Sequence, residues 1–232
     1  MKIMLFAAGG DIGGGKTHIL SLARELSAGN DLRLVSFRSG VLADEGRAMG
    51  LDVIVLENGW NILKDMRLAL SEVDGFRPDL IHCHGAKANM LGVIVKKLRN
   101  IPVMTTVHSD PRLDYMGMPL KQYTFGLINA IALRNMDFYM AVAGKMESNL
   151  IERGFDPWRI FTIYNGLDFS NASEKPKAPK QNDEDIIVGI AARLTPIKDI
   201  GTLIRAFKLA YEKNPRLRLL IAGTGEDEQE LR

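Results

Sequence analysis

The sequence predicts an α/β fold built on parallel sheets, and three observations lead to this prediction. Short apolar segments alternate along the chain with longer segments whose apolar residues recur at helical spacing. Some of the short segments, such as 53–56, are apolar on both faces, as strands of a covered parallel sheet must be. A polar segment at 166–185, which contains two prolines, interrupts the alternation before it resumes. We therefore expect two domains joined by a linker.

The first domain is predicted over residues 1–165. Its strands are expected at 3–8, 32–37, 53–56, 80–84, 103–108, 138–142 and 160–164. Its helices are expected at 17–28, 41–49, 62–73, 87–98, 121–133 and 145–152. Because strands that alternate with helices are joined by right-handed crossovers, these strands should form one parallel sheet.

The second domain is predicted to begin at residue 186. A strand at 186–191 is followed by a helix at 202–212, a strand at 217–222 and a glycine turn at 223–225. About 47 residues are too few for a domain with its own sheet, so we expect 186–232 to be the first part of an incomplete domain.

Composition places the chain among ordinary soluble globular proteins, with 46% hydrophobic and 25% charged residues. The net charge of +2 does not favour nucleic acid as a partner, although it allows weak attraction to an anionic surface. The single cysteine, Cys83, excludes internal disulfides and indicates a reducing compartment. Residues 1–8 are too short for a signal peptide, and no apolar run approaches the ~20 residues of a membrane span. We therefore expect a cytoplasmic protein.

A glycine-rich stretch, Gly-Gly-Asp-Ile-Gly-Gly-Gly-Lys-Thr at 9–17, joins the first predicted strand to the first helix. Such a turn lets backbone approach a phosphate, and the helix N-terminus favours an anion. From Gly10 the letters match the P-loop pattern of nucleoside triphosphatases. A P-loop enzyme also needs an apolar strand that ends in Asp to hold magnesium. The candidate strands here end at Glu57, His84 or His108.

Histidines mark the ends of two predicted strands. His84 ends one strand and His108 the next, so both should line a crevice at the carboxyl edge of the sheet. His82 and His84 lie on one face of their strand, and with His108 they could form a three-histidine zinc site. Because no carboxylate falls at ligand spacing nearby, we favour no metal, with one histidine fixed by backbone and the other lining the crevice. Cys83 faces the opposite side and should be an inert core residue.

A pair of cations follows the strand at 186–191. Arg193 and Lys198 flank Pro196, and at this spacing they can hold a diphosphate from two sides. The plainer interpretation is that both are exposed basic residues, with Asp199 as a helix N-cap. A second glycine turn follows the next predicted strand, and its glycines are Gly223 and Gly225.

Together these segments resemble glycosyltransferase family 4, whose members have the GT-B fold of two facing Rossmann-like domains. The resemblance covers nearly the whole chain. It is carried by Gly13-Gly14 with the following helix, Pro-Asp-Leu-Ile-His-Cys-His-Gly at 78–85, Ile-Pro-Val-Met-Thr-Thr-Val-His at 101–108, Tyr-Asn-Gly-Leu-Asp at 164–168, Ala-Arg-Leu at 192–194 with Lys198, and Ile-Ala-Gly-Thr-Gly at 221–225.

The resemblance implies that the first domain binds an acceptor and the second a nucleotide sugar, and that transfer retains anomeric configuration. Arg193 and Lys198 would hold the donor diphosphate and stabilise the charge that builds on it, without a tightly bound cofactor or metal. His108 would contact the donor sugar. The remaining donor- or acceptor-binding residues would be Gly13, Gly14, His84, Asn165, Gly223 and Gly225.

The implied acceptor is a glycan or a lipid-linked molecule of cell-envelope or polysaccharide synthesis. The protein would work in the cytoplasm or at the inner face of the membrane, with weak peripheral membrane association and no nucleic acid. A paired-glutamate element that the family carries later in its donor domain would lie beyond Arg232, so we expect no sugar transfer by 1–232 alone. The alternatives are a P-loop nucleoside triphosphatase, a non-catalytic fragment that binds a glycan or partner, and a nucleotide-sugar epimerase of similar fold.

Overall fold

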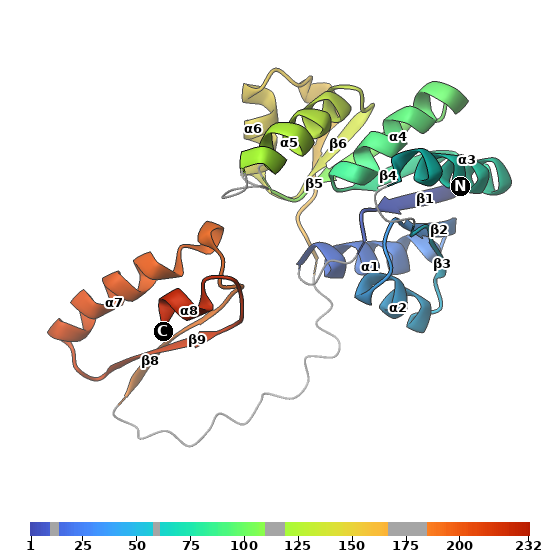
Figure 1. Cartoon of the computed structure of the whole chain (residues 1–232). Helices are drawn as coiled ribbons and strands as arrows, with labels where there is room; N and C mark the ends of the chain where they lie inside the picture. Colours follow the sequence, from blue (N-terminus) through green and yellow to red (C-terminus); the bar gives the residue numbers. More distant parts are fainter. Residues whose placement is uncertain (10–13, 58–60, 110–118, 167–184) are drawn as a thin grey trace. The chain divides into compact units, whose positions relative to one another are not determined.

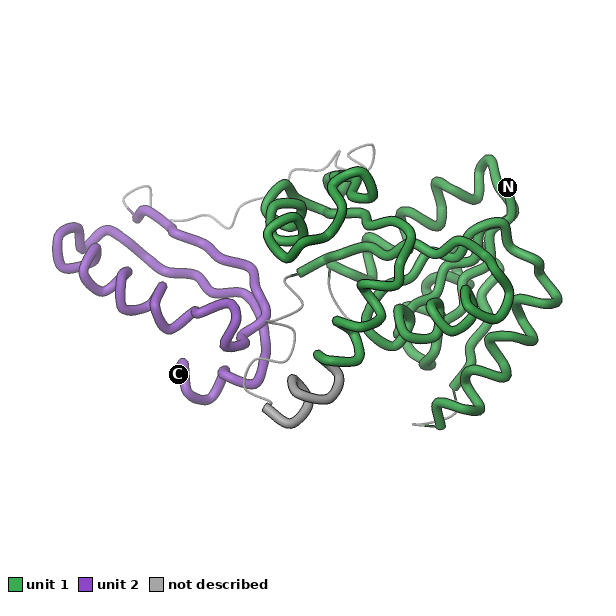
Figure 2. The backbone as a smooth tube through the Cα atoms, turned by 90° about the horizontal axis from the view of Figure 1, so that it is seen from above, with its two compact units in different colours: residues 1–166 green, residues 167–232 purple. Residues whose placement is uncertain are grey.

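The computed structural model describes residues 1–9, 14–57, 61–109, 119–166 and 185–232. The chain divides into two compact units, Met1–Gly166 and Leu167–Arg232, which are coloured separately in Figure 2. The first unit contains one sheet of seven parallel strands in the order β3-β2-β1-β4-β5-β6-β7. The expected α/β fold with a parallel sheet is confirmed.

The strands and helices of the first unit lie within a few residues of their predicted positions. The strands are β1 (Lys2–Ala7), β2 (Asp31–Ser36), β3 (Asp52–Val55), β4 (Leu80–His84), β5 (Val103–Val107), β6 (Phe138–Ala141) and β7 (Ile160–Thr162). The helices are α1 (Gly14–Ser27), α2 (Val41–Ala48), α3 (Ile62–Phe76), α4 (Ala86–Arg99), α5 (Pro119–Arg134) and α6 (Gly144–Glu152). The largest differences are at helix ends, because the hydrophobic pattern of the sequence locates helix ends less precisely than it locates strands.

Two hydrophobic clusters lie on the two faces of this sheet. Helices α1 and α2 pack on one face, where Leu5, Ala7 and Leu34 meet Leu20 and other helical residues. Helices α3, α4, α5 and α6 supply apolar residues to the cluster on the other face (Figure 1). This is the cover on both faces that apolar parallel strands require. The strand order reverses its direction between β1 and β4, which places a topological switch point at their carboxyl ends.

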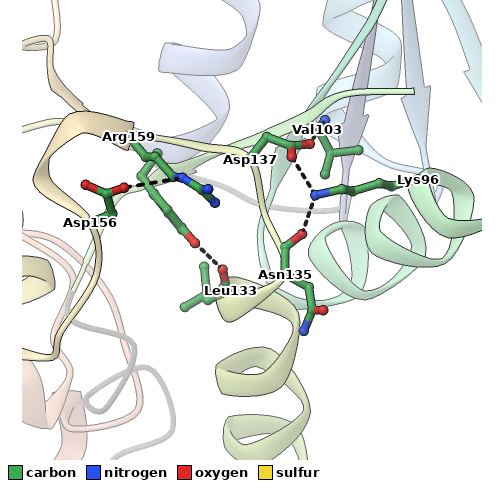
Figure 3. A network of polar contacts seen from close by, with 8 residues as sticks. Lys96, Val103, Leu133, Asn135, Asp137, Asp156 and Arg159 are labelled. Atoms are coloured by element: carbon green, nitrogen blue, oxygen red, sulfur yellow. Dashed lines mark hydrogen bonds and ion pairs between the residues drawn. The ribbon is translucent and has the colours of Figure 1, made fainter. Parts of the chain in front are cut away.

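A polar network ties the end of α5 to the centre of the sheet (Figure 3). The Asp137 carboxylate accepts hydrogen bonds from the Val103 amide at 2.9 Å and from Lys96 Nζ of α4 at 2.6 Å. Lys96 Nζ also donates to the Asn135 carbonyl at 2.9 Å. These bonds fix the point at which the chain enters β6. They also give the polar groups of the network hydrogen-bond partners.

The second unit contains a two-stranded parallel sheet of β8 (Ile186–Ala191) and β9 (Leu217–Ala222). The strands are followed by α7 (Ile200–Lys213) and α8 (Glu228–Leu231) respectively, and a 3-10 turn, Pro196–Lys198, precedes α7. Among its described hydrophobic residues only Leu194 and Ile200 are buried. Of all the helices that the structure describes, none has the length and apolar content of a membrane span.

Candidate functional site

The four histidines of the chain gather at the carboxyl edge of the large sheet. His82 and His84 lie in β4, His108 follows β5 directly, and His18 lies near the start of α1. The register pairs His82 with Leu5 and His84 with Ala7, so both imidazoles lie on the face that α1 covers. The strand ends predicted from the sequence therefore meet, and α1 adds a histidine that the sequence analysis did not place in the site.

Three of these imidazoles form a compact group. The ring centroids of His18 and His108 are 4.9 Å apart, those of His84 and His108 5.6 Å, and those of His18 and His84 5.8 Å. His84 Nδ1 and His108 Nε2 are 3.3 Å apart, a weak hydrogen bond. One nitrogen from each of the three rings lies within 4.8 Å of the other two.

His82, which the sequence analysis weighed as the third member and did not favour, is not part of this group of nitrogen atoms. His82 lies one strand period before His84, deeper in the sheet, and its Nε2 is 2.7 Å from the Thr106 hydroxyl. A threonine side chain, and not backbone, therefore fixes this buried ring. His18 takes the third place because the second turn of α1 faces the strand end. The only sequence signal for it was its position just after the glycine-rich stretch.

Burial lowers the pKa of all four imidazoles, because a ring removed from water resists protonation. The pKa of His108 falls to about 4 through burial and the nearby His18, and that of His82 to about 3. Burial also lowers the pKa of His18, but a hydrogen bond with the Asn165 side chain acts in the opposite direction. An uncharged imidazole has one nitrogen that donates a hydrogen bond and one that accepts.

Asn165, which the sequence analysis assigned to the site, is thus a neighbour of His18. It lies after β7, and its exposed side chain bonds the imidazole that α1 brings to the same edge. The contact places Asn165 beside the histidine group.

Two glycines, Gly9 and Gly85, give the backbone a positive φ where β1 and β4 end. Gly9 after β1 has φ +83°, and a Cβ there would lie 2.5 Å from the Ser36 hydroxyl. Gly85 after β4 has φ +91° and is the N-cap of α4. Gly14 begins α1, and no described atom lies within 4 Å of where its Cβ would be. Gly13, the other predicted loop glycine, lies outside the described residues.

Lys16, the lysine of the P-loop pattern, forms an ion pair with an acid. Its Nζ lies 2.5 Å from the Glu45 carboxylate of α2, and the Lys16 side chain is 16% exposed. The charge that a P-loop would direct at a nucleotide phosphate is therefore matched by a protein carboxylate.

The second unit presents Arg193 and Lys198 on the turn between β8 and α7. Both are exposed, and among the described residues neither forms an ion pair. Pro196 begins the 3-10 turn that ends at Lys198, and Asp199 caps α7 by accepting a hydrogen bond from the Thr202 amide at 3.3 Å. The predicted N-cap is confirmed, and the cap fixes the backbone beside Lys198 while leaving its ammonium group available.

The glycines after β9, for which a binding role is predicted, have a packing role in the structure. A Cβ at Gly223 would lie 1.8 Å from the Ala192 carbonyl oxygen, and one at Gly225 would lie 2.0 Å from that of Leu194. The Leu194 amide donates to the Thr224 carbonyl at 2.9 Å, which binds the two turns together. Only glycine fits this close backbone approach, so these residues shape the turn that carries Arg193.

The family "Glycosyltransferase Family 4" matches residues 12–171, and "Glycosyl transferases group 1" matches residues 171–232. The chain therefore belongs to glycosyltransferase family 4, as the resemblance implied. Membership in this family favours a glycosyltransferase over the P-loop nucleoside triphosphatase and the epimerase as interpretations of the sequence.

Two curated proteins are similar in sequence to this chain. The chain is 28% identical over 202 residues to an alpha-monoglucosyldiacylglycerol synthase of Acholeplasma laidlawii, covering 73% of this chain and 50% of that protein. It is 21% identical over 193 residues to the capsular polysaccharide biosynthesis glycosyltransferase CapM of Staphylococcus aureus, covering 79% and 50%. The chain thus spans about half the length of the curated relatives it matches.

A solved structure shows the same fold. Anabaena HepE, crystallised with UDP-glucose, superimposes with a TM-score of 0.78 at 18% identity, over 100% of this chain and 64% of HepE. This similarity confirms the GT-B fold, in which two Rossmann-like parts each contribute a parallel sheet.

Proposed function

We propose that this protein is a glycosyltransferase that moves a sugar from a nucleotide-sugar donor to a glycan or lipid-linked acceptor of the cell envelope. The match of residues 12–171 and 171–232 to consecutive glycosyltransferase families carries the proposal. The names of the relatives support a lipid or polysaccharide acceptor, and UDP-glucose in HepE supports a nucleotide-sugar donor.

Arg193 and Lys198 are assigned to the donor diphosphate. Both are exposed cations without an ion-pair partner among the described residues, on a turn fixed by the Asp199 cap and the Gly225 contact. As the glycosidic bond to the donor breaks, negative charge accumulates on the leaving diphosphate. Cations already held in place stabilise that charge without reorganisation in the transition state. Gly223 and Gly225 let the backbone approach the nucleotide.

The histidine group is assigned to the sugar and acceptor side. His108 contacts the donor sugar, and His84, Asn165 and the loop of Gly13 and Gly14 complete the surface against which the acceptor reacts. Neutral imidazoles suit this task, because they donate and accept hydrogen bonds with hydroxyl groups without repelling a cationic sugar in the transition state. Transfer proceeds with retention of anomeric configuration, and cations of the protein stabilise the charge of the transition state.

The proposed place of work is the cytoplasm or the inner face of the membrane. A net charge of +2 supports weak peripheral attraction to anionic lipid, where a lipid-linked acceptor would be found. Flotation with anionic and neutral vesicles tests this association, and equal recovery with both would contradict it.

The function is tested on the full-length protein with radiolabelled UDP-glucose and either diacylglycerol vesicles or an oligosaccharide acceptor. Lys198→Ala should lower the transfer rate ~100- to 1,000-fold, because a cation needed mainly in the transition state is lost. Lys208→Ala, an exposed lysine of α7 in the same unit, is the matched control and should leave the rate unchanged.

Three outcomes would contradict parts of the proposal. A Lys198→Ala variant with normal turnover would remove the role given to that lysine. A product of inverted configuration, seen in its anomeric proton coupling, would exclude retention. Tight binding of nucleotide sugars without transfer to any acceptor would favour the non-catalytic alternative.

A further inference from the structure

The imidazoles of His18, His84 and His108 form a group that sugar binding alone does not explain. They come from three separately anchored segments: α1, the end of β4 and the residue after β5. One ring nitrogen of each lies within 4.8 Å of the others, and among the described residues the group includes no carboxylate. Rigid elements thus hold three nitrogen donors around a single point.

Two nitrogens of this group lack a hydrogen-bond partner. Nε2 of His84 and Nε2 of His18 are both buried and unpaired among the described residues, and the His84 residue is only 3% exposed. A buried polar atom without a partner costs stability, so its retention calls for a ligand. Because an unpaired imidazole nitrogen is a metal ligand as well as a hydrogen-bonding group, the observation points beyond hydroxyl recognition.

We propose that His18, His84 and His108 bind a zinc ion. Imidazole nitrogen suits zinc, whereas magnesium and calcium prefer oxygen ligands that the described group does not offer. Three histidines with an open fourth position form a known type of zinc site. Zinc–nitrogen bonds of 2.0–2.1 Å in a tetrahedron place the nitrogens about 3.3 Å apart. The rings therefore need to move inward by roughly 1 Å, which side-chain rotation about fixed backbones provides.

The surroundings allow the ion to enter and to bind. His18 and His108 are half-buried, so the group can be reached from solvent, while His84 forms its floor. His82 stays outside the site, because its Nε2 is bonded to Thr106.

Zinc at this site would inhibit sugar transfer, and this consequence rests on the proposed function. A metal ion that uses the lone pair of His108 prevents that ring from contacting the donor sugar. Bound zinc also places a positive charge where a cationic sugar develops, which opposes the transition state. The site therefore makes the enzyme sensitive to free zinc.

Metal binding is measured on the 232-residue protein by titration with zinc alone against a chromophoric chelator. One zinc per chain should bind saturably. Loss of an outer-shell partner alone costs about 10–100-fold in metal affinity, so His18→Asn and His108→Asn should each cost at least as much. Cys83→Ala is the control: it removes the chain's single thiol, which is buried on the other face of β4, and should leave the affinity unchanged.

A second measurement needs no variant. Long-range proton–nitrogen spectra of the wild-type imidazoles should show zinc-dependent shifts at three of the four histidines, with His82 least affected. Absence of saturable binding, unchanged affinity in both histidine variants, or loss of binding in Cys83→Ala would overturn the site. Zinc binding without inhibition of transfer would leave the site intact and contradict the role given to His108, so the two failures are distinguishable.

Discussion

Lys16 shows how a single residue separates two interpretations of one sequence pattern. Its ammonium group pairs with Glu45, and the pair is partly exposed, at 16% and 45% for the two side chains. In a glycosyltransferase this lysine anchors α1 to α2 and does not bind phosphate. Lys16→Ala should therefore leave kcat/KM within a few-fold and lower the free energy of unfolding by about 1 kcal/mol or less.

Steady-state kinetics and urea unfolding of the same preparation check this prediction. Glu45→Gln serves as the control, because it removes the same ion pair from the other side and should cost a similar free energy. If Lys16→Ala abolished activity together with ATP affinity, the P-loop interpretation would be correct after all.

Residues at strand ends could be predicted from the sequence, and a residue on a helix could not. His84 and His108 each end an apolar segment, so the topology alone places them at one edge of the sheet. His18 reaches the same group only through the packing angle and rotation of α1, which hydrophobic periodicity does not define. Gly223 and Gly225 were expected from a nucleotide-binding resemblance, but their close contacts with Ala192 and Leu194 appear only in three dimensions.

At the scale of elements, a buried ion pair joins α3 and α4. Asp65 in the first turn of α3 is fully buried, and Lys87 Nζ at the start of α4 lies 2.7 Å from its carboxylate. The lysine also lies 5.7 Å from the centroid of the Phe37 ring. Lys87→Met should lower the free energy of unfolding by about 3–5 kcal/mol, because it leaves a buried carboxylate without its cation.

Urea unfolding measures this loss, and a double variant separates charge from packing. Asp65→Asn combined with Lys87→Met removes both charges, so it should recover much of the stability that Lys87→Met loses. If the double variant were no more stable than Lys87→Met, the loss would come from packing around Phe37 and not from the lost ion pair.

Element boundaries show where local sequence signals end and tertiary contacts begin. The pattern predicted that the helix from residue 62 ends at 73, before a glycine, Gly75, that is unfavourable inside a helix. In the structure α3 continues to Phe76 and ends with Arg77 in the left-handed conformation. Phe76 lies beneath the cations of Lys2 and Arg33, and these contacts with β1 and β2 extend the helix by one turn.

At the scale of the whole molecule, the two units differ in how much apolar surface they bury. In the first unit both faces of the sheet carry continuous clusters of buried residues. In the second unit Leu209 is 63% exposed, Leu220 60% and Ile186 46%. None of Ile187, Ile190, Leu219 and Ile221 in these two strands is buried either. The alternation of apolar residues could predict these strands, but not what covers them.

This difference predicts unequal local stability along the chain. Among the described strands β8 pairs only with β9, and a sheet of two strands is marginal without a covered face. Amides of 186–191 and 217–222 should therefore exchange at least about 100-fold faster than those of β1 and β4, a gap of ~2.7 kcal/mol in opening free energy. Hydrogen exchange followed by mass spectrometry of the 232-residue protein measures both sets at once. If exchange in β8 and β9 slowed as the protein concentration rose, a second copy would be covering their apolar side chains. Equally slow exchange in a monomer would show that α7 and the turns already stabilise this sheet, and the prediction would then be wrong.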